Sequence, residues 1–486
     1  MDEQLLQQMR RARTASATRS VAGNEVLQLL DPGSIIEYGP LASATNRTDD
    51  DAPGDGLIAV SGKLGGHPLV VAAFDPSVLA GTISDRNSRK LLRVLSLAIR
   101  HRWPFVCVVD GDGSRTEGGA PPPILLTPPS RFDIFSSLAE LSGWAPTIAI
   151  ITSSALDAHA SMAMMCDVVI ATADATLGGK QSGTTHRVSA TERAKLGDVN
   201  VIAADTAGAI EITRACLDLY LKPVADPGAP ADGWQDVADI IPDNRRRPYD
   251  MRRIIRAIAD DGSVIELGAT HGRSMLTCFA RLEGCSIGIF ANQPKSPLAG
   301  AIDAAAADKA ARFIELCDAW EFPLVSFIDN PGYMVGPQAE REGIARHHAR
   351  PLSALHHRTV PLCSVQLRKA YGLGPYAMSG WGASRITPEM RLAWPSVESG
   401  GMSLEGAAYL VKRKEIQAAA NHREAMAIRD AYADKMRDAS TGLKAARAYM
   451  YDDVIEPADT RAQIAQLIRQ TPRKLPDVKK HHVDPR

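Results

Sequence analysis

The two halves of the chain repeat one pattern at an offset of about 219 residues, and this repeat constrains the fold more than any other feature. Residues 104–113 (PFVCVVDGDG) match residues 323–332 (PLVSFIDNPG). Each segment is an apolar run, typical of a buried strand, that ends in a turn of the form Asp-x-x-Gly. A repeat of this length corresponds to a whole domain, because solenoid repeats have periods of about 20–50 residues.

The elements upstream of these strands repeat as well. The turns at 64–67 and 282–285 each join two β-rich runs, which predicts two hairpins: 57–62 with 69–74, and 276–282 with 286–291. Each hairpin precedes a segment with apolar residues at three- and four-residue spacing, which predicts a helix. These positions are Leu91, Val94, Leu95, Ala98 and Ile99 in the first half, and Phe313, Leu316, Cys317 and Trp320 in the second. The shared order predicts two similar α/β domains.

The length and one irregular segment indicate where the domains divide. A chain of 486 residues is too long for a single hydrophobic core. Residues 223–236 are rich in Pro, Gly, Ala and Asp and show no periodicity, as expected of a linker or long loop. Downstream, Asp250 is placed to cap a helix at 251–259. We therefore predict an N-terminal domain over residues 1–239 and a C-terminal domain over residues 240–486.

The composition argues against several classes of function. A net charge of −1 gives no global affinity for nucleic acid or membranes. No segment approaches about 18 uninterrupted apolar residues, the length that a membrane span requires. The seven cysteines are scattered and form no Cys-x-x-Cys or Cys/His cluster, so no metal site is expected. We expect a soluble, cytoplasmic protein without a nucleic-acid or membrane partner.

Motifs along nearly the whole chain resemble the carboxyltransferase (beta) subunit of biotin-dependent acyl-CoA carboxylases of the propionyl-/acetyl-CoA type, in the crotonase superfamily. They lie, in order, at Asn24–Glu37, Ile240–Tyr249, Gly288–Pro294, Lys309–Phe313, Asp329–Gly332, Gly343–His347, Arg368–Gly372 and Ala393–Pro395. The resemblance implies an α/β fold with two tandem crotonase-like ββα-spiral domains. Family members assemble as hexamers of stacked trimeric rings. Their chemistry takes place where the first domain of one subunit faces the second domain of another.

By this resemblance, the N-terminal half would hold the acyl-CoA substrate and the C-terminal half the carboxybiotin of a partner. The sequence contains no Met-Lys-Met biotin-attachment site and no biotin carboxylase region. We therefore expect biotin to be carried on a separate polypeptide, with a biotin carboxylase and a biotin carboxyl carrier as partners. The assembly would be a homo-hexamer or a mixed hexamer with a sister subunit.

The reaction that the resemblance implies moves a carboxyl group from carboxybiotin to the α-carbon of an acyl-CoA through an enolate. It needs stabilisation of negative charge on two oxygens, one of the thioester and one of biotin. Backbone N–H groups at glycine-rich corners supply this stabilisation. The family's biotin-side oxyanion hole falls on Leu373 and Gly374, with Tyr371 and Gly372 at the biotin. Leu373 is compatible with this role if its φ is negative, because only its main-chain N–H is needed. A plain tight turn would also explain the glycines.

The first half departs from the family pattern. The Gly-Gly of the acyl-CoA oxyanion hole becomes Asp157-Ala158, and the upstream Ser-Gly-Gly-Ala-Arg corner keeps Gly113 and Arg115 but gains Asp112. A carboxylate beside a developing enolate opposes it electrostatically. Either Asp157 faces a polar or cationic group on an unusual acyl chain, or this half has lost catalysis.

His159 lies beside the altered hole, as a general base or as a partner for Asp157. Together with Gly113 and Arg115 it forms the predicted substrate-binding set. Three functions follow. The first is a catalytic carboxyltransferase subunit. The second is a non-catalytic or half-active paralogue in a mixed carboxylase complex. The third is a biotin-independent crotonase-type enzyme such as a decarboxylase or hydratase, which the retained segment Arg368–Gly374 disfavours. The sequence does not identify the acyl chain.

Overall fold

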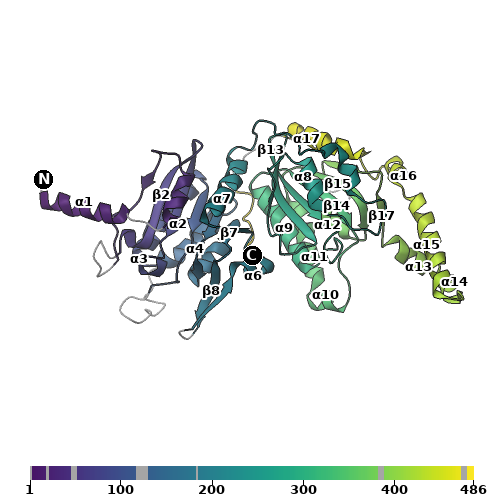
Figure 1. Cartoon of the computed structure of the whole chain (residues 1–486), viewed down its shortest axis with the longest axis horizontal. Coiled ribbons are helices and arrows are strands. Elements are labelled where there is room, and N and C mark those ends of the chain that lie inside the picture. Colours follow the sequence, from purple (N-terminus) through teal and green to yellow (C-terminus); the bar gives the residue numbers. More distant parts are fainter. Residues whose placement is uncertain are drawn as a thin grey trace. The chain divides into compact units, whose positions relative to one another are not determined.

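The computed structural model describes residues 3–17, 21–44, 52–115, 130–181, 184–380, 388–471 and 479–485 (Figure 1). The chain divides into two compact units, Met1–Leu221 with Pro476–Arg486, and Lys222–Leu475. These limits differ from the predicted domains, 1–239 and 240–486, at both ends of the second domain. Val237 lies in the core of the second unit, whereas the Val483 N–H donates to Ser142 Oγ of the first at 3.0 Å. Each segment therefore packs with the unit that supplies its contacts.

The sheet of the first unit begins as an antiparallel hairpin and continues as a parallel sheet. Its order is β1 (Ile36–Glu37), β2 (Leu57–Leu64), β3 (His67–Phe74), β4 (Phe105–Val108), β5 (Thr147–Ile151), β7 (Val168–Thr172) and β10 (Val201–Ala203). The register from Leu57 opposite Phe74 to Leu64 opposite His67 confirms the first predicted hairpin. A separate small sheet contains β6 (Ser154–Leu156), β8 (Thr176–Gln181) and β9 (Thr184–Ser189).

Helices cover both faces of this first sheet. On one face lie α3 (Asp85–His101) and α4 (Ser130–Leu141), and on the other α2 (Val21–Val26) and α7 (Thr206–Leu221). The predicted helix is confirmed as α3, whose residues Leu91, Val94 and Leu95 are fully buried. It begins with a capping box, in which the Ser84 and Asn87 side chains satisfy each other's backbone N–H groups. Two short helices, α5 (Ala158–Met164) and α6 (Ala190–Leu196), follow β6 and β9.

The second unit repeats the strand order of the first. Its sheet runs β11 (Ile265–Glu266), β12 (Met275–Leu282), β13 (Cys285–Asn292), β14 (Leu324–Asn330), β15 (Leu362–Tyr371), β16 (Met390–Ala393) and β18 (Asp453–Val454), with β17 (Glu398–Gly400) also paired to β15. Strands β11, β12 and β13 are antiparallel and the later pairs are parallel, as at the corresponding places in the first sheet. The predicted duplication is thereby confirmed.

The residues of β12 alternate between two cores. Leu276, Cys278 and Ala280 pack with α8 (Met251–Ile258) and α17 (Thr460–Gln470). Phe279 faces the other way and stacks on Trp320, just after α9 (Ala304–Ala319), with ring centroids 5.1 Å apart. The helices α10 (Pro337–Arg341), α11 (Ile344–His357) and α12 (Gly374–Ser379) come later in the chain, and α11 packs against α9. As predicted, Asp250 caps α8 by accepting from the Arg252 N–H.

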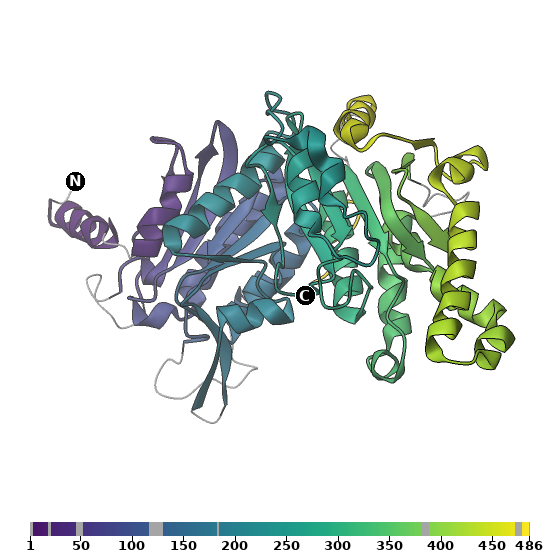
Figure 2. The same cartoon turned by 45° about the vertical axis from the view of Figure 1, so that its right-hand side comes forward.

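Four helices separate β17 from β18: α13 (Leu404–Val411), α14 (Arg413–Ala418), α15 (His422–Ala439) and α16 (Gly442–Arg447). Figure 2 shows them in yellow-green. Leu404 and Ala408 of α13 and Ala433 of α15 bury a small cluster around Tyr371, the last residue of β15. None of the helices in the described ranges has the length and apolar character that crossing a bilayer requires.

Candidate active site

The corner after β15 leaves two backbone N–H groups without an acceptor. Gly372 adopts a φ of +62°, and its N–H donates to Gly400 O at 3.0 Å. Leu373 has a φ of −83°, so the condition set for it is met. Because α12 begins at Gly374, the N–H groups of Leu373 and Gly374 find no acceptor among the described residues.

A buried ion pair between Asp329 and Arg368 links the strands β14 and β15 next to this corner. The carboxylate of Asp329, at the end of β14, accepts from Arg368 Nε at 3.0 Å and from the Lys369 N–H at 3.2 Å. Asp329 is 1% exposed and Arg368 3%. The Arg368 guanidinium also lies over the Tyr249 ring, 5.0 Å from its centroid. The pair joins the ends of two neighbouring strands at the point where the corner starts.

A second buried carboxylate holds Tyr371. The Tyr371 hydroxyl donates to Glu398 Oε1 at 2.8 Å, while Glu398 Oε2 pairs with Arg245 at 2.9 Å and Arg437 at 2.8 Å. Burial alone would raise the pKa of Glu398, but the hydrogen bonds from Arg437 and Tyr371 outweigh it and hold the pKa below its ordinary value. Burial beside Glu398 raises the pKa of Tyr371. Tyr371 therefore stays a neutral donor with its hydroxyl turned to Glu398.

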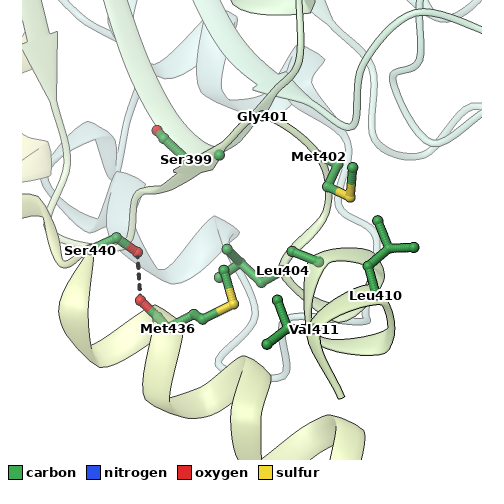
Figure 3. Close-up of a pocket in the computed structure, with 10 residues that line it drawn as sticks. Ser399, Gly401, Met402, Leu404, Leu410, Val411, Met436 and Ser440 are labelled. Carbon is green, nitrogen blue, oxygen red and sulfur yellow. Dashed lines mark hydrogen bonds between the residues drawn. The ribbon is translucent and has the colours of Figure 1, made fainter. Parts of the chain in front are cut away.

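A pocket with a volume of about 370 Å³ adjoins this corner (Figure 3). Its wall contains Gly400, whose carbonyl accepts the Gly372 N–H. The rest of its lining is mainly apolar and comes from the turn after β17 and from α13 and α15: Met402, Leu404, Ala407, Leu410, Val411 and Met436. A mainly apolar cavity of this kind suits the apolar body of a ligand.

The corner of the first unit has the same shape, with Asp157 at its turn. Asp157 has φ +51° and ψ −114°, a conformation that glycine adopts readily and other residues rarely. Its N–H donates to Gly178 O at 2.9 Å, so this N–H is already paired. The next N–H groups, those of Ala158, His159 and Ala160 at the start of α5, have no acceptor among the described residues.

Both additional aspartates of this corner face Lys180 of β8. Asp157 Oδ1 accepts from the Lys180 backbone N–H at 3.0 Å. The Lys180 ammonium pairs with Asp112 Oδ2 at 2.6 Å and donates to Asp112 O at 3.1 Å. Lys180 therefore balances the charge of Asp112. Among the described residues, the exposed carboxylate of Asp157 accepts from a neutral donor, the Lys180 backbone N–H.

Arg115 is held inside the first unit by residues from two other segments, Asp55 and Thr82. Its guanidinium pairs with the fully buried Asp55 and donates to Thr82 Oγ1 at 3.0 Å and Thr82 O at 3.1 Å. Only 10% of the Arg115 side chain is exposed. This geometry favours a role in anchoring the loop and gives no support to the predicted contact with substrate.

His159 is fully buried and contacts Gly113. Its Nδ1 accepts from the Gly113 N–H at 3.2 Å, and its ring packs edge-on against Phe74, with centroids 4.6 Å apart. Burial lowers the pKa of His159 to about 4. Of the two roles expected for it, neither a base exposed to substrate nor a hydrogen-bonded partner of Asp157 matches this placement.

The burial of His159 predicts a pH-dependent stability. Between pH 6.5 and pH 4 the unfolded chain binds a proton at this residue and the folded chain does not, so acid favours unfolding. Relative to His159→Asn, which keeps an acceptor but does not titrate, the wild-type free energy of unfolding should fall by about 2 kcal/mol between pH 7 and pH 5. Guanidinium unfolding of both proteins at the two pH values measures this. Parallel pH dependences would contradict a buried neutral imidazole.

The sequence analysis did not identify three of these residues. Lys180 lies in no motif, and only the fold brings β8 beside the corner. Glu398 lies in a short strand that pairs with the end of β15. Asn330, whose Oδ1 accepts from the Gly332 N–H at 2.6 Å, belongs to the repeated Asp-x-x-Gly segment, where its difference from Gly111 was the available signal.

Two duplicated sheets, each with a strand–turn–helix corner that presents unpaired N–H groups, define a protein of two tandem crotonase-like domains. The carboxyl transferase domain family matches residues 14–483, and the chain belongs to this family. Both the fold class and the family predicted from the sequence are confirmed, and the chain is an enzyme subunit.

Relatives of known name are similar over most of their length. The chain is 33% identical to the methylmalonyl-CoA carboxyltransferase 12S subunit of Propionibacterium freudenreichii subsp. shermanii, over 96% of this chain and 91% of that one. It is 31% identical to the propionyl-CoA carboxylase beta chain of Saccharopolyspora erythraea, over 95% and 90%.

Solved structures agree. A transcarboxylase 12S hexamer with methylmalonyl-CoA bound matches with a TM-score of 0.81 at 30% identity, over 97% of this chain and 93% of that one. A single-chain, multi-domain long-chain acyl-CoA carboxylase matches with a TM-score of 0.86 at 33% identity. This second match covers 96% of this chain but 49% of that one.

Proposed function

We propose that this protein is the carboxyltransferase subunit of a biotin-dependent acyl-CoA carboxylase. It would move a carboxyl group from carboxybiotin on a partner protein to the α-carbon of an acyl-CoA. The observation that carries this proposal is that each unit has a corner with adjacent N–H groups that find no acceptor among the described residues, including Ala158-His159 and Leu373-Gly374. The reaction needs one such pair for each of two oxygens.

In the second unit, the N–H groups of Leu373 and Gly374 would hold the ureido oxygen of biotin. The apolar pocket beside Gly400 would accept the hydrocarbon part of the same group. Tyr371 and Gly372 then act mainly through the corner itself, since the Tyr371 hydroxyl is bonded to Glu398 and the Gly372 N–H to Gly400. The N–H donors match the polar oxygen of biotin, and the apolar lining of the pocket matches its hydrocarbon part.

In the first unit, the N–H groups of Ala158 and His159 would hold the thioester oxygen. This places the donor pair one residue later than the Asp157-Ala158 pair expected from the sequence, because the Asp157 N–H is bonded to Gly178. Removing one donor of this kind from an oxyanion hole typically costs about 3–4 kcal/mol of transition-state stabilisation. The donors stabilise the enolate that forms when the α-proton leaves.

Carboxybiotin, when bound, supplies the carboxyl group: its N–carboxyl bond breaks to release carbon dioxide, and the freed ureido nitrogen takes the α-proton. The chain's own contribution is alignment and charge stabilisation: one corner holds the thioester, the other holds the ureido oxygen, and the enolate carbon attacks carbon dioxide. No side chain of this protein has to exchange a proton in that sequence.

The partners we propose are a biotin carboxylase and a biotin carboxyl carrier, with a homo-hexamer or a mixed hexamer as the assembly. A direct test mixes the purified chain with these two partners, ATP, labelled bicarbonate and a panel of acyl-CoAs. Labelled acid-stable product from at least one thioester is expected. If the protein assembles with an active sister subunit but carboxylates none of the panel, the proposal fails and the half-active paralogue replaces it.

The presence of Asp157 favours the half-active paralogue, and replacing this residue distinguishes the paralogue from a catalytic subunit. Asp157→Asn keeps the acceptor for the Lys180 N–H but removes a negative charge beside the enolate. Because this carboxylate is exposed and screened, the gain should be about 1 kcal/mol, or about fivefold in kcat/KM for propionyl-CoA. Asp112→Asn is the control and should change less, since Lys180 already neutralises Asp112. A loss of activity in Asp157→Asn would instead show that this carboxylate serves the substrate.

A further inference from the structure

In each unit, the N–H of the glycine in the Asp-x-x-Gly segment donates to a buried side chain, and the two units supply this acceptor from different elements. In the first unit, the Gly113 N–H donates to Nδ1 of His159, which belongs to α5, the helix after β6. In the second unit, Gly332 donates to Oδ1 of Asn330 at 2.6 Å, and Asn330 belongs to the strand before the glycine. One acceptor position, which we call the corner seat, is thus filled by different elements in the two halves.

The strand registers show that these positions correspond. Gly111 pairs in parallel with Ala155 in the first unit, and Asn330 with Ala370 in the second. Continuing along the same strands, Leu156 lies opposite Gly178 and Tyr371 opposite Gly400. The equivalent pairs are therefore Gly111 with Asn330, Asp157 with Gly372, and His159 with Gly374.

Each seat has room for one side chain. A Cβ atom on Gly374 would lie 2.6 Å from Asn330 Oδ1 and 2.7 Å from both Cγ and Nδ2 of the same side chain. In the first unit, a Cβ atom on Gly111 would collide with His159 Nε2. Where one element supplies the acceptor, the facing element is glycine. His159 and Asn330 are 0% exposed.

We propose that His159 and Asn330 are positioning residues that fix the distance between each Asp-x-x-Gly corner and the N–H pair beside it. This inference rests on the proposed function for its catalytic meaning. His159 is itself a member of the first N–H pair, and Asn330 packs directly on Gly374, a member of the second. The side chain in the corner seat therefore fixes the position of the N–H pair beside it, although neither side chain takes part in the reaction.

In the second unit, the acceptor can be moved by mutation from the strand, as in Asn330, to the helix, as in His159 of the first unit. Asn330→Gly empties the seat, and Gly374→His alone places a Cβ atom against Asn330. The double variant Asn330→Gly/Gly374→His reproduces the arrangement of the first unit, because the three nearest atoms to a Cβ on Gly374 all belong to Asn330. Each single variant should lose more than tenfold in kcat, with KM for free biotin changed less. The double variant should return to within about threefold of wild type.

The assay uses the full chain with methylmalonyl-CoA and free biotin as probes and follows release of propionyl-CoA. In parallel, thermal unfolding of the same four proteins is measured, which does not depend on activity. A double variant that unfolds above both singles supports the corner seat even if wild type transfers no carboxyl group, an outcome that would count against the proposed function alone. A double variant no better than the worse single in both measurements overturns the inference.

The first unit supplies a matched control. His159→Gly/Gly111→Asn should not recover, because a Cβ atom on Gly111 would also lie 2.6 Å from the backbone oxygen of Gly81, which cannot move away as a side chain can. His159→Asn keeps an acceptor near Nδ1 and His159→Leu removes it, so kcat should fall at least tenfold further in His159→Leu than in His159→Asn. Equal kcat values for these two variants would refute the positioning role.

Discussion

Asp329→Asn is expected to destabilise the protein by about 3–5 kcal/mol and to abolish carboxyl transfer. The substitution keeps an oxygen for the Lys369 N–H but leaves the Arg368 guanidinium, only 3% exposed, without its counter-charge. An uncompensated buried charge carries a cost of this size. Because Arg368 and Lys369 lead directly into the Tyr371–Gly374 corner, the loss reaches the biotin side. Urea unfolding and the methylmalonyl-CoA assay measure the two effects.

The duplicate residue provides the control. Asp110 occupies the same place in the first unit and is 0% exposed. Its donors among the described residues are neutral: the N–H groups of Thr152 at 2.9 Å and Ser153 at 3.0 Å, and the Thr152 hydroxyl. Burial raises the pKa of both carboxyls, but within the described ranges only Asp329 has a neighbouring cation, Arg368, that counteracts this effect. Asp110→Asn should therefore cost about 1 kcal/mol or less. Equal losses at the two positions would show that the Arg368 charge is not the cause.

Local patterns in the sequence were sufficient to predict most of the fold. The hairpins, the helix α3 and the cap of α8 follow from periodicity and turn chemistry over a few residues. The repeated Asp110 and Asp329 marked the two corners, and in the structure both carboxylates join neighbouring strand ends. The physics of these features is short-range, and a single sequence contains it.

The details of the candidate site depend on contacts between distant segments. The offset between the halves falls from 219 residues at Gly111 and Asn330 to 215 at Asp157 and Gly372, so alignment alone did not pair His159 with Gly374. Whether Asp157 meets a ligand or a protein group depended on Lys180, which β8 brings from outside every motif. The paired state of the Asp157 N–H likewise follows from the strand beside it.

Glu398→Gln tests whether the biotin side is held by its buried charge network. Glu398 joins the Tyr371 hydroxyl to Arg437 of α15, and α15 forms part of the pocket through Met436. Loss of the charge should cost about 2 kcal/mol, within the range for hydrogen bonds to charged groups. Because the pocket wall loosens while the first unit is untouched, KM for free biotin should rise at least fivefold and KM for methylmalonyl-CoA should stay constant.

Arg437 pairs with both a buried and an exposed carboxylate, so replacing each in turn shows how much of the effect depends on burial. Arg437 also pairs with Asp434, whose side chain is 71% exposed, against 4% for Glu398. Asp434→Asn should change the free energy of unfolding by less than about 0.5 kcal/mol, because water and salt screen an exposed pair. If both variants raise KM for biotin equally, Arg437 acts through its total charge and the buried link to Tyr371 is unimportant. If only Glu398→Gln does, the corner that holds biotin is positioned by a carboxylate that biotin never touches.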